Sequence, residues 1–540
     1  TGVQTCALPI WKRMDKKWVK RGKCRNFAEY VLEQTGKGLE EVVLSESQFY
    51  QCPGISQAAS VLKKAVAENR PIHVVADYDA DGLGAAAQMF MILRRLKATK
   101  FKITIPKRLK DGYGINMRIV DEIPDGAFLI TLDNGISAFD AITEAKRRGM
   151  TVVILDHHLR STELPPADLI VDPEDNPVGW TYRHYCGSGL AYKLGQSLFN
   201  NNPQVMGKLS VFACISTIAD SVDVTADNRN IILTGLRNLN IRNCPEGLAA
   251  LLDILKNENS MEHIGCEEIG YKIAPAINAP GRLYDEGGKL LLSSIFQTGE
   301  KAYEAARWLY ETNEKRKAAV KKAGNAVEPL GEKIRFVYLP GFEEGLCGIL
   351  AGNICEDSRR PTFVMTDAAD GSIKGSARSV EGTNVFELLT KAAPFLLKFG
   401  GHEFAAGFSF ARENLDNVFL TLEQNANAAS DTQQEFFDLE INQEEIFQVY
   451  LETDDVSVFG TGLPRPVFRI RADIEEAKLV GSDMSHLSFK INGQKCIGFS
   501  LAEKYIALGS PMKMIVYGTL STNWWKGRAS IQIDVIDIEL

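Results

Sequence analysis

Short apolar runs alternate with helical stretches between about residues 55 and 235. The runs are rich in valine and isoleucine, and the segments between them are long enough for crossover helices. The runs lie at Ile72–Ala76, Ile103–Ile105, Phe128–Leu132, Val152–Leu155 and Leu169–Val171. This pattern predicts a parallel, doubly wound sheet of the α/β class.

The pattern changes twice further along the chain. A long helix of polar and charged residues is predicted over 301–326, and a smaller α/β region follows it, with strands near 336–339 and 362–366. From about residue 433 the apolar runs become short and alternating, which favours a small β-barrel.

Composition narrows the class of protein. The length of 540 residues corresponds to three or four domains, and 45% hydrophobic with 24% charged residues is typical of soluble globular proteins. No stretch approaches the roughly 18 consecutive apolar residues of a membrane helix. The ten cysteines are scattered without a CxxC pair, which favours buried thiols in a reducing cytoplasm. The chain starts at Thr1, and we expect residues 1–13 to be a non-native or disordered leader.

The formal net charge of −8 argues against a protein that binds nucleic acid over its whole surface. The charge is uneven, however. Residues 411–458 hold twelve acids and one arginine, which leaves the rest of the chain at +3. Residues 94–118 hold nine lysines and arginines and one aspartate. A local basic channel is therefore compatible with an acidic chain, and we expect the acidic segment to face away from it.

Three aspartates follow the first apolar run. Asp77, Asp79 and Asp81 come directly after Ile72–Ala76 and precede a helix predicted over 85–96. On an extended backbone, residues at i, i+2 and i+4 point to the same side, so the pattern predicts that these carboxylates converge.

Three further segments end in acids or histidines. Asp133 follows Phe128–Leu132, the trio Asp156, His157 and His158 follows Val152–Leu155, and Asp220 closes a later apolar segment. Ligands of open α/β sheets bind beyond the carboxyl ends of the strands, so we expect one common site. Each residue alone would more often be a helix cap or a turn residue, but together they indicate function.

Several carboxylates can be packed together only if cations lie among them. A mixed set of aspartate and histidine ligands suits Mn²⁺ or Mg²⁺, and the imidazoles favour Mn²⁺. The ligands are numerous enough for two ions, an arrangement that suits in-line displacement at phosphorus.

These motifs carry a family resemblance. The segments Asp77-Tyr-Asp79-Ala-Asp81-Gly, Asp133-Asn-Gly, Asp156-His157-His158 and Ala-Asp220 resemble the four ordered motifs of the DHH phosphoesterase superfamily, and within it the RecJ single-strand-specific exonucleases. The resemblance covers the chain from about residue 20 to its end. It implies a site for two metal ions lined by Asp77, Asp79, Asp81, Asp133, His157, His158 and Asp220. All of these except Asp77 are also the expected catalytic residues.

The resemblance also implies finer roles. Asp133 and Asp220 would serve both metals, and Asp156 would orient the histidines from behind. Two departures from the family pattern are mild, because neither removes a ligand: Ala76 stands where the family often has glycine, and Asn134 where it often has cysteine.

Further residues fit a nucleotide chain as substrate. Arg108 and Tyr113 lie in the basic stretch 94–118, whose charge alone would equally fit a solvated face. A Gly-Arg turn at 281–282, a turn at 375–379 and a glycine-rich loop at 399–408 resemble the phosphate-binding parts of the family's DHHA1 domain. By this resemblance, Arg108 contacts the entering strand. The residues expected to bind phosphates, including a 5′ phosphate, are Arg282, Ser376, Arg378, Gly400, Gly401 and His402.

The last region resembles the family's OB-fold. Trp524, Trp525, Lys526 and Arg528 are candidates for binding a single strand, although paired tryptophans in a small barrel are as often core residues. The expected domains are a DHH domain over 14–235, a helical connector over 236–330, a DHHA1 domain over 331–428 and an OB-fold over 433–540.

The function that this resemblance implies is metal-dependent degradation of single-stranded DNA from its 5′ end to 5′-mononucleotides, in repair and recombination. A phosphodiesterase of short oligonucleotides or cyclic dinucleotides remains an alternative, although that class usually lacks the OB-fold. A catalytically silent replication scaffold is another, although it would have lost metal ligands. A pyrophosphatase of the same superfamily would not need the strand-binding parts. The resemblance further implies a single-strand-binding protein and a RecQ-type helicase as partners, a monomer and no membrane association.

Overall fold

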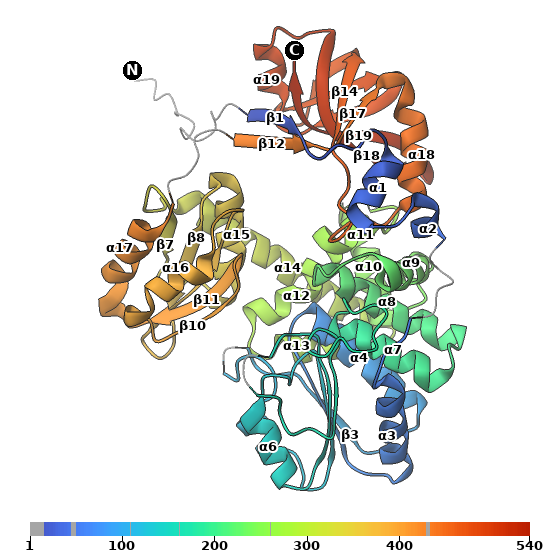
Figure 1. Ribbon diagram of the computed structural model, residues 1–540, viewed down its shortest axis with the longest axis vertical. Coiled ribbons are helices and arrows are strands. Elements are labelled where there is room, and N and C mark those ends of the chain that lie inside the picture. The colour runs from blue at the N-terminus through green and yellow to red at the C-terminus, as the bar shows by residue number, and fades with distance from the viewer. Residues whose placement is uncertain (1–15, 45–49, 109, 161–162, 260, 428–432) are drawn as a thin grey trace. The chain divides into compact units, whose positions relative to one another are not determined.

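The structure is a computed structural model of the 540-residue chain. It describes residues 16–44, 50–108, 110–160, 163–259, 261–427 and 433–540 (Figure 1). The predicted leader at 1–13 lies outside these residues. The chain divides into two compact units. Of the described residues, the larger unit comprises those within Trp18–Asn278, Gly288–Arg307 and Glu435–Leu540, and the smaller comprises Lys16, Lys17 and those within Ala279–Gly287 and Trp308–Gln434.

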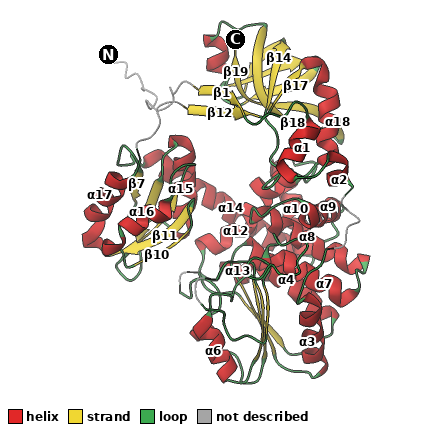
Figure 2. Ribbon diagram, viewed as in Figure 1, coloured by secondary structure: helices red, strands yellow, loops and turns green. Residues whose placement is uncertain are grey.

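The larger unit contains a five-stranded, all-parallel sheet in the order β3-β2-β4-β5-β6. Figure 2 shows its strands in yellow between α6 (Phe139–Arg147) and α3 (Ile55–Ala67). The strands are β2 (Ile72–Ala76), β3 (Phe101–Thr104), β4 (Phe128–Leu132), β5 (Thr151–Leu155) and β6 (Leu169–Val171). Each lies within two residues of the predicted run, which confirms the doubly wound sheet. Strand β3 lies on one side of β2 and β4 lies on the other, so the direction in which successive strands are added reverses at β2. Open α/β sheets bind ligands at such a switch point.

Helices cover both faces of this sheet, which is why its strands read as continuous apolar runs. Val74 and Ile130 pack in a core with α3 (Ile55–Ala67), α4 (Ala80–Arg95) and α7 (Gly187–Phe199), whereas Val75 and Leu129 pack with α5 (Met117–Asp121) and α6 (Phe139–Arg147). Helices α3 and α6 lie on opposite sides of the sheet in Figure 1.

A group of helices follows the sheet. Its central member, α8 (Pro203–Ala219), is buried along most of its length, is capped by Asn202 and ends at Asp220. The predicted helix over 301–326 is confirmed as α14. The other elements of this group are α9 (Ala226–Asn240), α10 (Glu246–Asn259), α11 (Cys266–Glu268), the π-helix η3 (Ile269–Ile273), α12 (Ala274–Leu283), α13 (Gly287–Ile295) and α14 (Glu300–Ala326).

The smaller unit is built on a second five-stranded sheet in the order β10-β11-β9-β8-β7, in which only β7 and β8 run parallel. The strands are β7 (Arg335–Tyr338), β8 (Thr362–Asp367), β9 (Ile373–Arg378), β10 (Lys398–Gly401) and β11 (Ala405–Phe410). Its helices are η4 (Glu344–Leu346), α15 (Cys347–Ser358), α16 (Val385–Lys391), η5 (Ala393–Phe395), η6 (Arg412–Asn414) and α17 (Leu415–Asn425). The predicted second α/β region is thus confirmed.

A seven-stranded sheet forms the C-terminal part of the chain, in the order β13-β14-β18-β19-β17-β16-β15. Its strands are β13 (Leu439–Asn442), β14 (Phe468–Asp473), β15 (Glu475–Val480), β16 (His486–Ile491), β17 (Gln494–Gly498), β18 (Lys513–Trp525) and β19 (Arg528–Glu539). Helices η7 (Gln443–Glu445), α18 (Ile446–Val456) and α19 (Ala502–Ala507) accompany it. The N-terminal elements are β1 (Lys16–Lys20), which pairs with β12 (Gln433–Phe437), α1 (Phe27–Thr35) and α2 (Leu39–Val43).

The thiols follow the prediction in the part of the chain that the structure describes. None of the nine cysteines there forms a disulfide bond, and six of them are buried: Cys24, Cys186, Cys214, Cys347, Cys355 and Cys496. Among the described residues, no helix combines the length and the apolar character needed to cross a lipid bilayer.

Candidate metal centre and strand-binding residues

The loop after β2 brings three aspartates together in a way that differs from the prediction. Helix α4 begins at Ala80, not at residue 85, so Asp79 is its N-cap and Asp81 lies in its first turn. The Asp79 carboxylate accepts the amides of Asp81 and Gly82 at 3.0 and 3.1 Å. The explanation from an extended backbone is therefore wrong, and a tight strand-to-helix turn replaces it.

Asp81 is held by the start of another helix. Its two carboxylate oxygens accept the backbone amides of Gly187 and Ser188, at 2.6 and 2.9 Å, at the beginning of α7. Helix N-termini offer such unpaired N–H groups to anions. A Cβ on Gly187 would lie 2.5 Å from Cβ of Asp133, so only glycine fits here. We did not predict Gly187 or Ser188; the available signal was the run Gly187-Ser-Gly before an apolar helix.

Asp133 follows β4 with a left-handed backbone conformation, φ 61°. The next residue, Asn134, is fully buried and ties the loop in place. Its amide oxygen accepts the Ile115 N–H at 3.1 Å, and its amide nitrogen donates to the carbonyls of Val75 and Leu132 at 3.2 and 2.8 Å. The asparagine at this position therefore joins the ends of two neighbouring strands, β2 and β4.

The two histidines after β5 face these carboxylates. His157 Nε2 lies 3.0 Å from Asp133 Oδ1 and 3.7 Å from Asp81 Oδ2. Asp156 is buried beneath them: it accepts the His157 amide at 2.8 Å and lies 2.8 Å from His158 Nδ1. A hydrogen bond from Nδ1 to a carboxylate leaves Nε2 of His158 as the nitrogen that is able to bind a cation.

Asp220 reaches the same place from a helix. It is the C-cap residue of α8, and its Oδ2 lies 3.7 Å from His157 Nε2. The sequence predicted only that Asp220 closes an apolar segment, and the structure shows that this segment is a helix. A buried helix and a buried strand have the same apolar composition over a few residues, so composition does not distinguish them.

The ligand atoms of these residues form three overlapping groups, in each of which all atoms lie within 4.8 Å of one another. The groups are Asp77, Asp79 and Asp133; Asp133, His157 and His158; and Asp81, His157 and Asp220. Asp133 belongs to two groups and so does His157, whereas Asp220 belongs to one. The structure therefore brings together all seven residues that the sequence singled out as metal ligands.

The electrostatics of the cluster call for a cation. Burial, reinforced by neighbouring carboxylates, raises the pKa values of Asp77 and Asp133 well above the ordinary range and that of Asp220 to about 8. Asp77 Oδ1 is buried and has no hydrogen-bond partner among the described residues. Oxygen ligands with two imidazoles fit Mn²⁺ or Mg²⁺, so the residues present suit a divalent cation.

Tyr113 and Arg108 lie beside the cluster. The Tyr113 hydroxyl donates to the carbonyl of Asp133 at 2.8 Å, and its ring meets that of His158 edge-on with centroids 5.6 Å apart. The Arg108 guanidinium lies 5.2 Å from the ring centroid of Tyr78.

Part of the charge in the basic stretch 94–118 is already offset. Arg118 forms an ion pair with Asp111 at 2.6 Å and another with Glu122, and Lys102 lies 3.3 Å from Glu122. Nine cations less Asp111 leave +8 for this stretch. That value overstates its field, because Glu122, which lies outside the stretch, also pairs with Arg118 and Lys102.

In the smaller unit, four of the six residues expected to bind phosphates lie on strands of the second sheet: Ser376, Arg378, Gly400 and Gly401. Ser376 and Arg378 lie on strand β9, not in a turn, and the supposed glycine-rich loop is the β10–β11 hairpin. Across this sheet Ser376 pairs with Gly407, which pairs with Gly400, and Gly401 pairs with Ala406. Glycine and serine runs favour turns by composition, but sheet pairing with β8 and β11 prevails here.

Arg282 and His402 belong to the same unit. Arg282 lies near the end of helix α12, not in a turn, and its Nη1 donates to the carbonyl of Gly345 at 3.4 Å. His402 is exposed just after β10; its amide donates to the Ala405 carbonyl at 2.9 Å. Because Ala405 pairs with Arg378, His402 and Arg378 lie in one row across the sheet.

The two tryptophans of the β18–β19 hairpin have different surroundings. The Trp524 ring stacks on His263 with centroids 4.8 Å apart, whereas Trp525 is 63% exposed and lies beside Lys526, 5.8 Å from the ammonium. The Glu262 carboxylate accepts the amides of Lys526 and Gly527, both at 2.7 Å. Trp525 is therefore the more accessible of the two tryptophans to a ligand.

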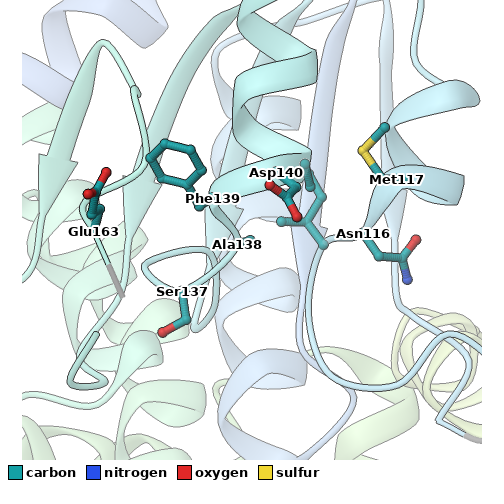
Figure 3. A pocket seen from close by; sticks show the side chains of 9 residues that line it. Asn116, Met117, Ser137, Ala138, Phe139, Asp140 and Glu163 are labelled. Carbon is teal, nitrogen blue, oxygen red and sulfur yellow. The ribbon is translucent and has the colours of Figure 1, made fainter. Parts of the chain in front are cut away.

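A pocket of about 510 Å³ lies next to α5 and α6 (Figure 3). Phe139 and Met117 line it together with the acids Asp140 and Glu163. The wall residue Ile115 is the one whose amide is bonded to Asn134, but the pocket itself contains none of the expected ligands.

The sheet, with its carboxylates and histidines at the switch point, defines a protein of the DHH class. A family model described as "DHH family, N-terminal domain" matches residues 71–217, a DHHA1 domain model matches 331–428, and a RecJ OB domain model matches 437–537.

Curated relatives extend this similarity to whole chains. Each of three relatives is named single-stranded-DNA-specific exonuclease RecJ. The relative from Haemophilus influenzae is 30% identical over 94% of this chain and 94% of its own length, and that from Dickeya dadantii is 34% identical over 67% of both. The relative from Bacillus subtilis is 30% identical over 90% of this chain but 64% of its own length. The chain belongs to the RecJ family of single-stranded-DNA-specific exonucleases.

Solved structures agree with this family. RecJ from Thermus thermophilus in complex with Mn²⁺ has a TM-score of 0.79 and 25% identity, over 95% of this chain and 76% of that one. An exonuclease RecJ bound to manganese has a TM-score of 0.60 and 28% identity, over 71% of this chain and 96% of that one. The predicted architecture of DHH, DHHA1 and OB domains is thereby confirmed.

Proposed function

We propose that the chain hydrolyses the phosphodiester bonds of single-stranded DNA from the 5′ end and releases 5′-mononucleotides. The observation that carries this proposal is the convergence of five aspartates and two histidines into three overlapping ligand groups at the switch point. Membership of the RecJ family supports the single-stranded substrate, since the curated relatives are named for it.

Two divalent cations would be held by the cluster, with Mn²⁺ favoured over Mg²⁺. Related RecJ structures are complexes with Mn²⁺ in one case and Mg²⁺ in another, which supports a divalent cation of this kind. The ligands that we assign are Asp77, Asp79, Asp81, Asp133, His157, His158 and Asp220. When bound, the cations lower the pKa of a coordinated water and neutralise charge on the phosphate oxygens.

The chain's own residues prepare this chemistry. Asp156 holds the His158 ring through Nδ1, which leaves Nε2 outside this hydrogen bond as the nitrogen that we assign to a cation. Tyr113 donates to the Asp133 carbonyl and so fixes the left-handed turn on which that carboxylate stands. The two amides at the start of α7 fix both oxygens of Asp81. We assign these contacts the role of holding the ligands in place before a substrate arrives.

Each unit, taken by itself, carries residues that we assign to the strand. Arg108 and Tyr113 are exposed enough to meet it beside the cluster. In the smaller unit we assign phosphates, including the 5′ phosphate, to Arg282, Ser376, Arg378, Gly400, Gly401 and His402. The domain bounds that we propose are those predicted from the sequence: 14–235, 236–330, 331–428 and 433–540.

The two alternative functions would require different sets of domains and metal ligands. A phosphodiesterase of short oligonucleotides or cyclic dinucleotides has no use for the seven-stranded C-terminal sheet, which matches the RecJ OB domain. A silent scaffold would lack ligands, but all seven are present in the described chain. Both observations favour the exonuclease.

The test is a nuclease assay in Mn²⁺ on single-stranded DNA labelled at the 5′ or the 3′ end and blocked at the other, with duplex DNA, RNA and dinucleotides alongside. We expect mononucleotides from single strands with a free 5′ end only. The variants Asp133→Ala and His157→Ala should lose activity by several orders of magnitude. His184→Ala is the matched control, because His184 is paired with Glu174 at 2.9 Å outside the cluster and should leave activity unchanged.

The outcomes separate the candidates. Retained activity in a folded Asp133→Ala variant would refute the assignment of these residues as the metal site. Faster turnover of dinucleotides than of long strands would favour the phosphodiesterase, and a wild-type protein that binds Mn²⁺ without cleaving any substrate would favour the scaffold.

Several further expectations stay predictions. They are a monomeric state, a bacterial-type cytoplasmic location, and contacts with a single-strand-binding protein and a RecQ-type helicase. Sedimentation of the purified protein, alone and mixed with each partner, measures the first and the last of these directly.

A further inference from the structure

Helix α14 carries a half-buried arginine to which the described residues bring no carboxylate. Arg316 donates its Nε–H to Asn313 Oδ1 at 2.9 Å, and within the described part of the chain no hydrogen bond or ion pair reaches its Nη atoms. Burial lowers the pKa of Arg316, and the charge of Glu314 opposes this shift, but Glu314 itself is bonded to Lys317 at 2.8 Å. A shielded cation without a counter-charge is costly, so an anion is expected there.

The geometry of Arg316 suits an oxyanion. Asn313 is 1% exposed, and its bond to Nε fixes the plane of the guanidinium. This leaves the two Nη groups as a fork, the arrangement with which arginine binds phosphate through two hydrogen bonds.

Contacts within the smaller unit place this side of α14 against the end of α12. Lys315 Nζ lies 5.5 Å from the ring centroid of Tyr284. Val320, one helical turn after Arg316, packs in a core with Leu283. Arg316 lies between these two contacts along α14, so it is on the side of the helix that faces the 283–284 segment.

That segment leads directly to the residues expected to bind phosphates. Arg282 donates to the Gly345 carbonyl just before α15. At the start of α15, a Cβ on Gly348 would lie 2.9 Å from Nη2 of Arg378. The neighbours of Arg316 on α14 thus contact the end of α12, which carries Arg282, and Arg282 in turn contacts the segment that leads to Arg378.

We propose that Arg316 binds a phosphate of the DNA strand beside Arg282 and Arg378, and that Asn313 is its positioning residue. The proposal rests on the proposed function, because that function supplies the phosphate. Such a residue would bind the phosphates of the strand without contacting its bases, as a nuclease that acts on any sequence requires.

The test measures binding without turnover. Fluorescence anisotropy in EDTA would compare single strands with and without a 5′ phosphate, over a range of salt concentrations. We expect Arg316→Ala to weaken binding about tenfold or more and to reduce the slope of log affinity against log salt by about 0.7, the loss of one phosphate contact. Arg316→Lys should restore the slope but only part of the affinity.

Two variants keep the result interpretable. Arg316→Gln retains an amide that is able to bond Asn313, so it should fold normally while showing the same loss of slope. Lys317→Ala removes a neighbouring charge that is already paired with Glu314, and it should leave affinity and slope unchanged.

The outcomes divide as follows. A loss confined to 5′-phosphorylated strands assigns Arg316 to the terminal phosphate, and an equal loss on both strands with a reduced slope assigns it to an internal one. Unchanged binding, or weaker binding with an unchanged slope, would overturn the proposal. This assay measures binding and not nuclease activity. A wild-type protein without nuclease activity would therefore refute the proposed function, whereas the binding result could still be interpreted.

Discussion

Replacing Asp133 with asparagine should make the metal-free protein more stable while it removes exonuclease activity. The carboxylate of Asp133 belongs to two ligand groups, and burial together with the charges of Asp81 and Asp79 raises its pKa well above the ordinary range. Asparagine keeps the shape of the side chain and tolerates the left-handed backbone at φ 61°. The substitution therefore removes the charge and little else.

The magnitude follows from the spacing of the ligand atoms. Two unit charges 4.8 Å apart, the limit within each group, repel by about 3.5 kcal/mol at an effective dielectric constant of about 20. Asp133 shares its group with Asp77 and Asp79, so two such interactions are relieved. Proton uptake by the carboxylates relieves part of this repulsion in the wild type, so we expect a net gain of about 1–3 kcal/mol in the free energy of unfolding.

Urea unfolding followed by circular dichroism measures the stability of both proteins without metal, in EDTA, and with metal, in Mn²⁺. In EDTA the variant should unfold at a higher urea concentration with an unchanged m-value. In Mn²⁺ the order should reverse, because the wild type gains about 2.7 kcal/mol per site at a hundredfold excess over the dissociation constant and the variant gains less.

Asp77→Asn is the companion variant, since Asp77 has no positive φ that asparagine would favour. A gain in both variants isolates charge as the cause. If Asp133→Asn were no more stable than the wild type in EDTA, or if Mn²⁺ left wild-type stability unchanged, the reasoning that these carboxylates repel one another until cations bind would be refuted.

Two further predictions concern pH and the C-terminal hairpin. The pKa of Asp220 is raised to about 8 by burial and by Asp81 and Asp79, so between about pH 4 and 8 the folded protein keeps a proton that the unfolded chain has lost. The metal-free protein should therefore lose stability as pH rises through this window, and urea unfolding in EDTA that showed a flat or rising trend would contradict this. Trp525→Ala should weaken the binding of a single strand by about 1–3 kcal/mol, which is the contribution of one stacked base. Phe447→Ala, which removes another exposed aromatic ring, should leave the affinity unchanged. Equal affinities of the Trp525 variant and the wild type in anisotropy titrations would contradict the prediction.

The sheet could be predicted from the sequence because every strand in it is buried on both faces. Such strands appear as continuous runs of valine and isoleucine, and Ile72–Ala76 and Phe128–Leu132 were located to the residue. The start of α4 was missed for the opposite reason. Ala80–Gly84 contains two glycines and an aspartate, which are poor helix formers, and only the cap formed by Asp79 shows where the helix begins.

The ligands themselves were also predictable, since each follows an apolar segment and the topology gathers those ends at one edge. What the sequence does not show is contacts between residues far apart in the chain. The engagement of Asp81 by Gly187 and the stacking of Trp524 on His263 depend on such contacts. Neither of them has a local pattern of periodicity or spacing.

The distances between the ligands are set by residues that contribute no ligand atom. A Cβ on Gly82 would lie 2.5 Å from the carbonyl oxygen of Asp77, and one on Gly187 would lie 2.5 Å from the Cβ of Asp133. Any larger residue at either place must push a ligand outward, and a shift of an ångström is enough to spoil a site that needs its groups within about 0.5 Å. A pattern that counts only carboxylates and histidines therefore identifies a site of this kind, whereas the neighbouring glycines decide whether its ligands can share a cation.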